Sequence, residues 1–89
     1  MVRCETRTGF VCELAENVMD NMELLDVMAD ETVEMAFRAS AAVKMILGAE
    51  QRKKLYDHLR TEDGRVPVAA VNEALEDILQ SFGKHGKNS

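Results

Sequence analysis

Tryptophan is absent from this 89-residue sequence, and proline, cysteine and aromatic residues are scarce. There is one proline, there are two cysteines, and a single tyrosine and three phenylalanines are the only aromatic residues. Aliphatic residues, alanine and six methionines must therefore fill the interior, and this composition favours helices over a sheet sandwich. A chain of this length forms one small domain with a modest core.

The sequence also lacks an apolar run of the roughly twenty residues that a membrane-spanning helix needs. No secretory signal peptide pattern is present, so we expect a soluble protein of the cytoplasm. Cys4 and Cys12 are close enough for a disulfide if the N-terminal segment folds back as a hairpin. Two cysteines in a chain without a signal peptide are more often free thiols, and both alternatives stay open.

Positive charge is missing from a long stretch of the N-terminal half. The chain has a formal net charge of −5, and no basic residue lies between Arg7 and Arg38. The acidic residues of this stretch are Glu13, Glu16, Asp20, Glu23, Asp26, Asp30, Glu31 and Glu34. Such a field repels nucleic-acid phosphates, so we expect no binding of DNA or RNA. The stretch is either a solvated face that keeps the protein soluble or a docking surface for a basic partner.

The spacing of apolar residues predicts a mainly α fold, a small bundle of about four helices. Residues 1–14 are expected to form a short extended or β-hairpin segment before it. The helices are expected at residues 17–28, from Asp30 or Thr32 to Leu47, at residues 49–60 and at residues 67–82. Gly48 ends the second helix. We expect residues 1–83 to form a single helical domain and residues 84–89 a disordered C-terminal tail.

The segment between the last two predicted helices looks at first like a calcium-binding EF-hand loop. Gly64 takes the sixth position of such a loop and Val66 the eighth, as the turn requires. The same register places Leu59 at the first position and Ala70 at the twelfth, where strong oxygen ligands belong. We therefore expect a turn without a calcium site, followed by Pro67 at the start of the next helix.

Residues that would carry catalysis or hold a metal are sparse. Asp57 and His58 are neighbours in sequence, so on a helix they point about 100° apart and cannot form a dyad. The two cysteines and two histidines of the chain lack the short spacing that structural zinc sites favour. They are Cys4, Cys12, His58 and His85. With no phosphate-binding glycine loop or nucleophile elbow either, we expect no enzyme, no cofactor and no metal site.

The first two predicted helices carry more apolar surface than one buried stripe needs. Apolar positions cover well over half of the circumference of the second helix. Packing by other helices on several sides would explain this excess, and so would a surface that binds a partner. Methionine is flexible and suits surfaces that accept varied apolar sequences. The candidate partner-binding residues are Met19, Met22, Val27, Met28, Met35, Phe37 and Met45. Burial of the same face between two copies of the chain is a further alternative, so self-association stays open.

Five segments spread over most of the chain resemble one family. They are residues 8–14 (TGFVCEL), residues 20–30 with Glu23, Leu24 and Leu25 at the centre, residues 46–51 (ILGAEQ), residues 58–67 (HLRTEDGRVP) and residues 87–89 (KNS). In these segments the chain is similar to the small tail assembly chaperones of long-tailed phages with non-contractile tails, as found in phages and prophages of Gram-positive bacteria. Residues 58–67 are the most specific block. Met22, where the family is expected to have an aromatic residue, and the less acidic residues 15–17 depart from the pattern.

The resemblance implies a non-enzymatic chaperone in the host bacterial cytoplasm. It would coat the long, hydrophobic tape measure protein and keep it soluble until tail tube subunits polymerise around it. The tape measure protein is then the expected partner, and the tail tube protein is a second candidate. The main alternative is a small acidic adaptor or inhibitor domain whose acidic face binds a basic host protein.

Overall fold

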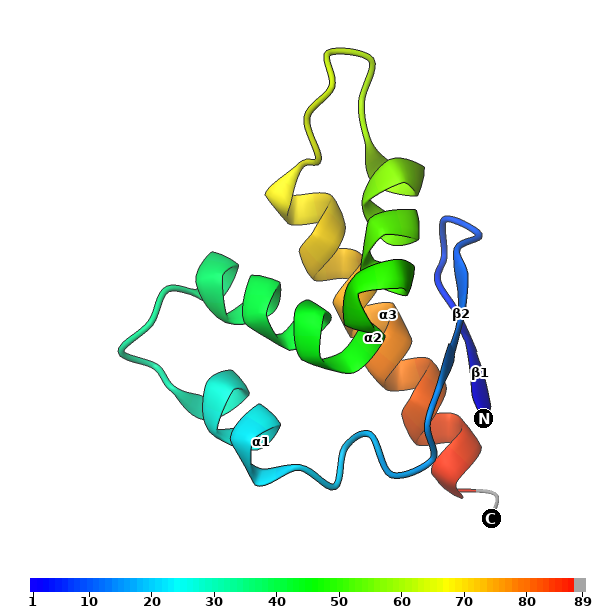
Figure 1. Cartoon of the computed structure of the whole chain (residues 1–89), viewed down its shortest axis with the longest axis vertical. Helices are drawn as coiled ribbons and strands as arrows, with labels where there is room; N and C mark the ends of the chain where they lie inside the picture. The colour runs from blue at the N-terminus through cyan, green and yellow to red at the C-terminus, as the bar shows by residue number, and fades with distance from the viewer. Residues whose placement is uncertain (88–89) are drawn as a thin grey trace.

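The chain folds into an N-terminal hairpin and three helices. The computed structural model describes residues 1–87, with side chains described for residues 1–84. The elements are strand β1 (Val2–Glu5), strand β2 (Val11–Leu14), helix α1 (Met22–Ala29), helix α2 (Met35–Leu59) and helix α3 (Val68–Lys87). The predicted mainly α fold with an N-terminal hairpin is confirmed. The predicted number of about four helices is one too high. Figure 1 shows α1 beside the first half of α2, and the hairpin beside α3 and the second half of α2.

The two strands of the hairpin each have one buried face and one exposed face, because successive side chains of a strand point to opposite faces. Buried and exposed residues alternate along both strands. In the antiparallel register Cys4 lies directly opposite Cys12, so both thiols are on the buried face. Gly9 forms the turn with a φ of 91°, a backbone angle that residues with a Cβ rarely adopt. The Thr6 N–H donates to the Phe10 carbonyl over 2.9 Å and closes the turn.

Helix α1 begins at Met22, later than the predicted start at residue 17. The reason is a local cap: the Asn21 side chain accepts a hydrogen bond of 3.1 Å from the Glu23 N–H. Asparagine is among the best N-cap residues because its short side chain satisfies a free N–H of the first turn. Upstream, the Asp20 N–H donates to the Asn17 carbonyl and forms a turn in place of a helix. Of the residues of α1, Leu24 alone is buried, so this helix lies on the surface.

The residues expected to cap the second helix form a turn before it. The Asp30 carboxylate accepts hydrogen bonds from the N–H and the hydroxyl of Thr32. These bonds lower the pKa of the Asp30 carboxyl. Helix α2 begins only at Met35, and Glu34 precedes it without a side-chain cap.

Helix α2 bends sharply at Gly48, where φ is 74° and ψ is 174°. These angles lie far outside the helical region, in a part of backbone space that is essentially restricted to glycine. The prediction placed the end of one helix and the start of another at this residue. The structure has these non-helical angles at the predicted boundary, and α2 comprises the two helical parts on either side of Gly48, which accounts for the difference in helix number. The bend directs the first half of α2 along α1 and the second half along the hairpin (Figure 1).

Helix α3 closes the core with one apolar side. Val71, Ala74 and Ile78 are buried at the helical spacing of three and four residues. The helix continues past its predicted end near Gly83 to Lys87. A single glycine costs a helix only about 1 kcal/mol relative to alanine, so it does not by itself end one. Residues 84–87 of the predicted disordered tail therefore belong to α3, and residues 88–89 lie outside the described part of the chain.

Polar contacts fasten the hairpin to α3. The Arg7 N–H donates to the Asp77 carboxylate over 2.9 Å, and the Arg7 guanidinium makes an ion pair of 2.8 Å with the same group. The hydrogen bonds from Arg7 lower the pKa of the Asp77 carboxyl. Beneath these contacts lies the core, whose largest fully buried side chains are Leu14, Leu24, Leu55, Ile78, Val43 and Cys4. The hairpin is therefore part of the domain and contributes to its core.

Candidate functional site

Four of the seven predicted partner-binding residues are exposed apolar side chains. Phe37 and Met22 are 67% and 68% exposed, and Met35 is 64% exposed. Met45 is less exposed, at 37%. Single exposed apolar side chains are common on protein surfaces, so the arrangement of these four decides whether they form a contiguous apolar patch.

The other three predicted residues lie deeper. Met19 and Met28 are half-buried and pack against the core. Val27 is also half-buried and lies in a small hollow of 170 Å³ beside Phe37. The seven residues therefore divide between core packing and exposed surface, and they do not form a single patch.

A longer depression lies on another side of α2, where α2 meets α3. It consists of two adjoining hollows. The first, of 220 Å³, is lined by Met28, Met35, Arg38, Leu75 and Glu76. The second, of 350 Å³, is lined by Tyr56, Val66, Val68 and Val71. Ala39 and Asn72 line both hollows, so the two meet at this pair. We name them together the α2–α3 groove.

Two polar atoms at the groove are buried and, among the described residues, have no hydrogen-bond partner. They are Nε of Arg38, a donor, and Oδ1 of Asn72, an acceptor. Another nitrogen of the same guanidinium, Nη1, donates to the Met28 carbonyl over 3.1 Å and ties α2 to α1. Leaving a buried polar atom unpaired costs about 1–3 kcal/mol. These two unpaired atoms are destabilising. A bound molecule that offers an acceptor to Arg38 Nε and a donor to Asn72 Oδ1 would remove this cost.

Most of this groove was not predicted from the sequence. Val68 is 57% exposed, and neither it nor Asn72 was predicted to bind a partner. The available signal was a set of small residues at helical spacing on α2, namely Ala36, Ala39 and Ser40. Small side chains on one side of a helix leave room for close approach of another chain.

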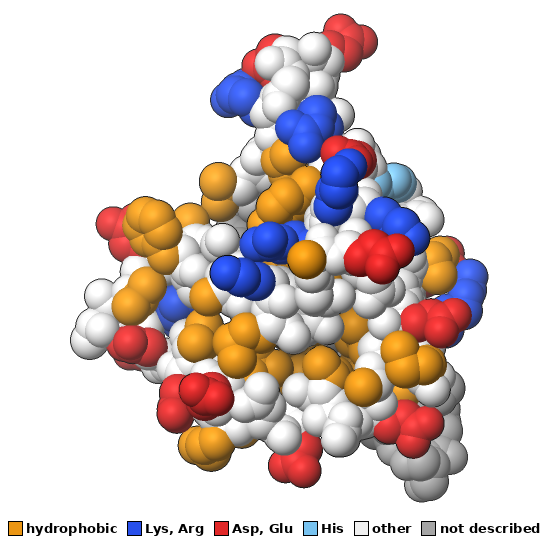
Figure 2. All heavy atoms as spheres, in the orientation of Figure 1, with side chains coloured by type: hydrophobic (Ala, Val, Ile, Leu, Met, Phe, Trp, Pro, Cys, Tyr) orange, Lys and Arg blue, Asp and Glu red, His pale blue; other side chains and the backbone are white. Residues whose placement is uncertain are grey.

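Acidic and basic side chains are concentrated on different parts of the surface (Figure 2). All eight acidic residues between Arg7 and Arg38 are exposed. In Figure 2, Asp and Glu side chains lie around α1, whereas Lys and Arg side chains lie over the second half of α2. Several of these basic residues pair within their own helix, such as Lys53 with Asp57 over 3.0 Å. The acidic side has few such partners: the one ion pair described for it joins Glu16 to the N-terminal amine over 3.6 Å.

The turn that looked like a calcium loop uses its oxygen atoms internally. The Asp63 carboxylate accepts hydrogen bonds from the Thr61 hydroxyl and from Arg65 Nε, the latter over 2.8 Å. These bonds lower the pKa of the Asp63 carboxyl. Arg60 Nη1 donates to the Gly64 carbonyl over 2.9 Å. Two arginine side chains thus occupy the positions around these oxygens, and the segment is held as a turn between α2 and α3.

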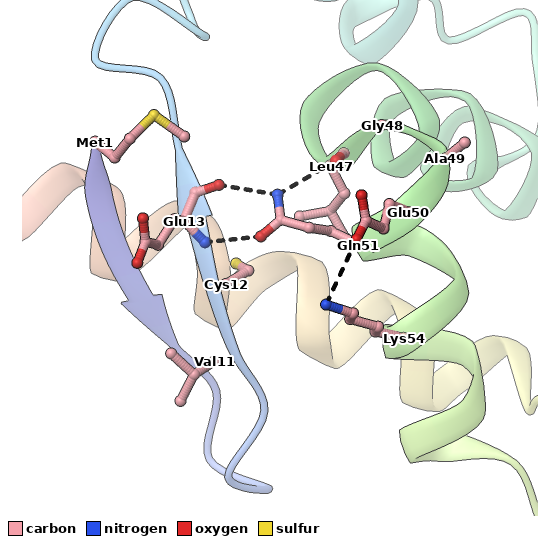
Figure 3. Close-up of a pocket in the computed structure, with 10 residues that line it drawn as sticks. All are labelled: Met1, Val11, Cys12, Glu13, Leu47, Gly48, Ala49, Glu50, Gln51 and Lys54. Atoms are coloured by element: carbon pink, nitrogen blue, oxygen red, sulfur yellow. Dashed lines mark hydrogen bonds and ion pairs between the residues drawn. The ribbon is translucent and has the colours of Figure 1, made fainter.

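The free edge of the hairpin is closed by a side chain. The Glu13 N–H donates to Gln51 Oε1 over 2.8 Å, and Gln51 Nε2 donates back to the Glu13 carbonyl over 2.9 Å (Figure 3). A third strand would make the same two hydrogen bonds at this residue. Gln51 therefore protects an edge that would otherwise invite strand pairing. The broad hollow of 570 Å³ beside it, which includes Lys54, is bordered by this polar contact.

His58 and the two cysteines, which are candidate metal ligands by residue type, contact other parts of the protein. The His58 ring nitrogen Nε2 is 3.2 Å from both the carbonyl and the hydroxyl oxygen of Thr8, so it links α2 to the hairpin turn. Cys4 and Cys12 are free, buried thiols. The fourth candidate metal ligand, His85, lies outside the described side chains. Within residues 1–84, no group of three His, Cys, Asp or Glu side chains is arranged to hold a metal ion.

Comparison with known proteins adds no identification. No protein-family model, no curated protein and no solved structure matches this chain. In the part of the chain that the structure describes, no helix has both the length and the apolar character needed to cross a membrane.

Burial makes the two thiols weaker acids than an exposed cysteine. Removal from water raises the pKa of Cys12 to about 11, and the neighbouring Cys4 adds to the effect. Burial raises the pKa of Cys4 as well. The thiolate is the reactive form of cysteine, so both residues are expected to be inert packing groups while the domain is folded.

We expect the free energy of unfolding to fall as the pH rises from about 8.5 to about 11. The folded chain holds the Cys12 proton to a higher pH than the unfolded chain does. Its contribution to stability is therefore complete below the pKa of an unfolded thiol and is lost as the pH rises through the folded pKa. Urea unfolding across this range should lose roughly 2 kcal/mol through Cys12. The matched variant Cys12→Ala should show a shallower decline, and an equal slope in both proteins would contradict the assignment.

Proposed function

We propose that the chain is a non-enzymatic chaperone of phage tail assembly. It binds apolar segments of the tape measure protein in the host bacterial cytoplasm and keeps that protein soluble before the tail tube forms. The observation that carries this proposal is the exposure of Met22, Met35 and Phe37, three large apolar side chains on the first two helices of an acidic domain. The likeness of residues 58–67 and of four further segments to tail assembly chaperones supports the same function.

The size of the exposed apolar surface suits reversible capture. Burying one large apolar side chain contributes about 1.5–3 kcal/mol. A client that covers three of them gains on the order of 5 kcal/mol before the cost of ordering the two chains. Association itself costs about 4–15 kcal/mol, so these three side chains alone give weak, reversible contact and further contacts must add to the capture. The exposed acidic residues give the complex a net negative charge, which opposes its aggregation.

Co-expression with a fragment of the tape measure protein tests the proposal. The double variant Met35→Asp and Phe37→Asp is expected to leave the chaperone folded, because both side chains are mostly exposed. The soluble fraction of the client should fall to its level without chaperone, because charged side chains do not bury against apolar segments. Val11→Lys is the control, since it adds a charge at another exposed apolar position and lies opposite Glu5, whose charge it complements. A folded double variant that keeps the client soluble would contradict the proposal.

A second candidate function rests on the acidic stretch. Its eight exposed carboxylates give an acidic adaptor or inhibitor domain a surface for a basic host protein. Salt separates the two functions. Binding between exposed opposite charges weakens steeply as salt screens them, whereas capture of an apolar client does not.

A further inference from the structure

The α2–α3 groove combines three features that together describe one kind of occupant. Its walls are apolar, with Met28 and Leu75 in one hollow and Val68 in the other. Where the hollows meet, its lining is the small Ala39 beside Asn72. Its two unpaired buried atoms are one donor, on Arg38, and one acceptor, on Asn72.

The donor and the acceptor complement the main chain of a peptide. In an extended chain, the N–H and the C=O of one residue point to the same side and are both free. In a helix the same groups are bonded within the helix and cannot be shared. A small residue between the two hollows lets a main chain approach closely, and the hollows on either side have room for apolar side chains.

We infer that the α2–α3 groove binds an extended apolar segment through its main chain. A carbonyl of the segment accepts a hydrogen bond from Arg38 Nε, and an N–H of the segment donates to Asn72 Oδ1. The flexible side chains of Met28 and Met35, which line the same hollow, move aside to admit it. The inference rests on the proposed function and adds the form of the client: the chaperone selects segments that have not yet become helical.

Binding of a short fluorescent peptide of alternating leucine and serine to the full chain tests this. The variant Asn72→Leu removes the acceptor and keeps a similar shape. It is expected to weaken peptide binding about fivefold, the equivalent of one hydrogen bond. Its melting temperature should stay the same or rise, because an unpaired buried acceptor is removed. Asn17→Leu makes the same chemical change in an exposed turn and should leave binding unchanged.

Chemical variants of the peptide identify the hydrogen bond. N-methylation of its leucines removes N–H donors and should also weaken binding to the unaltered protein. Combined with Asn72→Leu, N-methylation should cause little further loss, because both changes remove the same hydrogen bond. A peptide of the same composition locked as a helix should bind more weakly than the extended one. Equal binding by the helical peptide, or fully additive losses, would overturn the inference.

Arg38→Lys is a second variant, and because it also loses the Nη1 hydrogen bond to the Met28 carbonyl, its melting temperature is measured together with peptide binding. It keeps the positive charge and removes Nε, and it should weaken binding to a similar extent. Co-expression with the tape measure fragment separates failure of this inference from failure of the proposed function. If the groove variants bind peptide normally while Met35→Asp with Phe37→Asp abolishes client solubility, the groove inference fails and the chaperone function stands. If neither set changes client solubility, the proposed function itself fails.

Discussion

The variant Gly48→Ala is expected to destabilise the fold by about 1–3 kcal/mol, although alanine is normally the better helix residue. A Cβ at Gly48 would meet no atom within 4 Å, so the cost is not a steric clash with a neighbour. It arises because φ of 74° with ψ of 174° is essentially closed to residues that have a Cβ. Urea unfolding followed by circular dichroism at 222 nm would measure the loss.

Gly83→Ala is the matched control for this prediction. Gly83 lies within α3, it is not among the glycines with positive φ, and a Cβ there also meets nothing within 4 Å. Alanine in place of this helical glycine should stabilise the domain by about 0.4–1 kcal/mol. Opposite signs at the two glycines would show that the backbone angle at residue 48 decides the outcome. Equal stabilisation at both would mean that α2 can straighten without loss.

The bend at Gly48 also shapes the α2–α3 groove. Ala36, Ala39 and Ser40 come from the first half of α2 and Tyr56 from the second half, and all four line the same hollow. A straight α2 would carry the two halves apart. Gly48→Ala is therefore expected to weaken peptide binding as well as folding.

Helix content was predictable because it depends on spacing along the chain, whereas helix ends depend on single contacts. The apolar spacing of Val71, Leu75 and Ile78 was sufficient to place α3. The start of α1 was not, because the Asn21 cap competes with a helix that the apolar pattern alone would extend to residue 17. The bend in α2 has the same origin, since one glycine can either end a helix or turn it, depending on what the following residues pack against.

The candidate site was predictable in type but not in position. Methionines on the first two helices indicated excess apolar surface, yet the sequence does not distinguish Met28, which packs against the core, from Met22, which is exposed. Tertiary packing makes that distinction. The α2–α3 groove depends on Asn72 lying beside Ala39, two residues far apart in sequence, so the small residues of α2 indicate one wall of the groove and do not place the other.

The variant Ile78→Ala is expected to lower the free energy of unfolding by about 2–5 kcal/mol. Ile78 is fully buried on α3, the helix that packs against both α2 and β1. Truncation removes apolar contacts and leaves a cavity that a small core closes only in part. Small domains have about 5–15 kcal/mol of stability in total, so this single change removes a large share. Thermal and urea unfolding would measure it.

Two further variants serve as comparisons for Ile78→Ala, one a smaller truncation at the same position and one a substitution at an exposed position. Ile78→Val removes one methylene and should cost about 0.5–1.5 kcal/mol. Gln80→Ala, at an exposed position of the same helix, should have little effect. A cost below about 1 kcal/mol for Ile78→Ala would mean that α3 does not pack as described. In co-expression, Ile78→Ala should lower the yields of folded chaperone and soluble client together, whereas Met35→Asp with Phe37→Asp should lower only that of the client. This difference separates residues that hold the fold together from those that bind the partner.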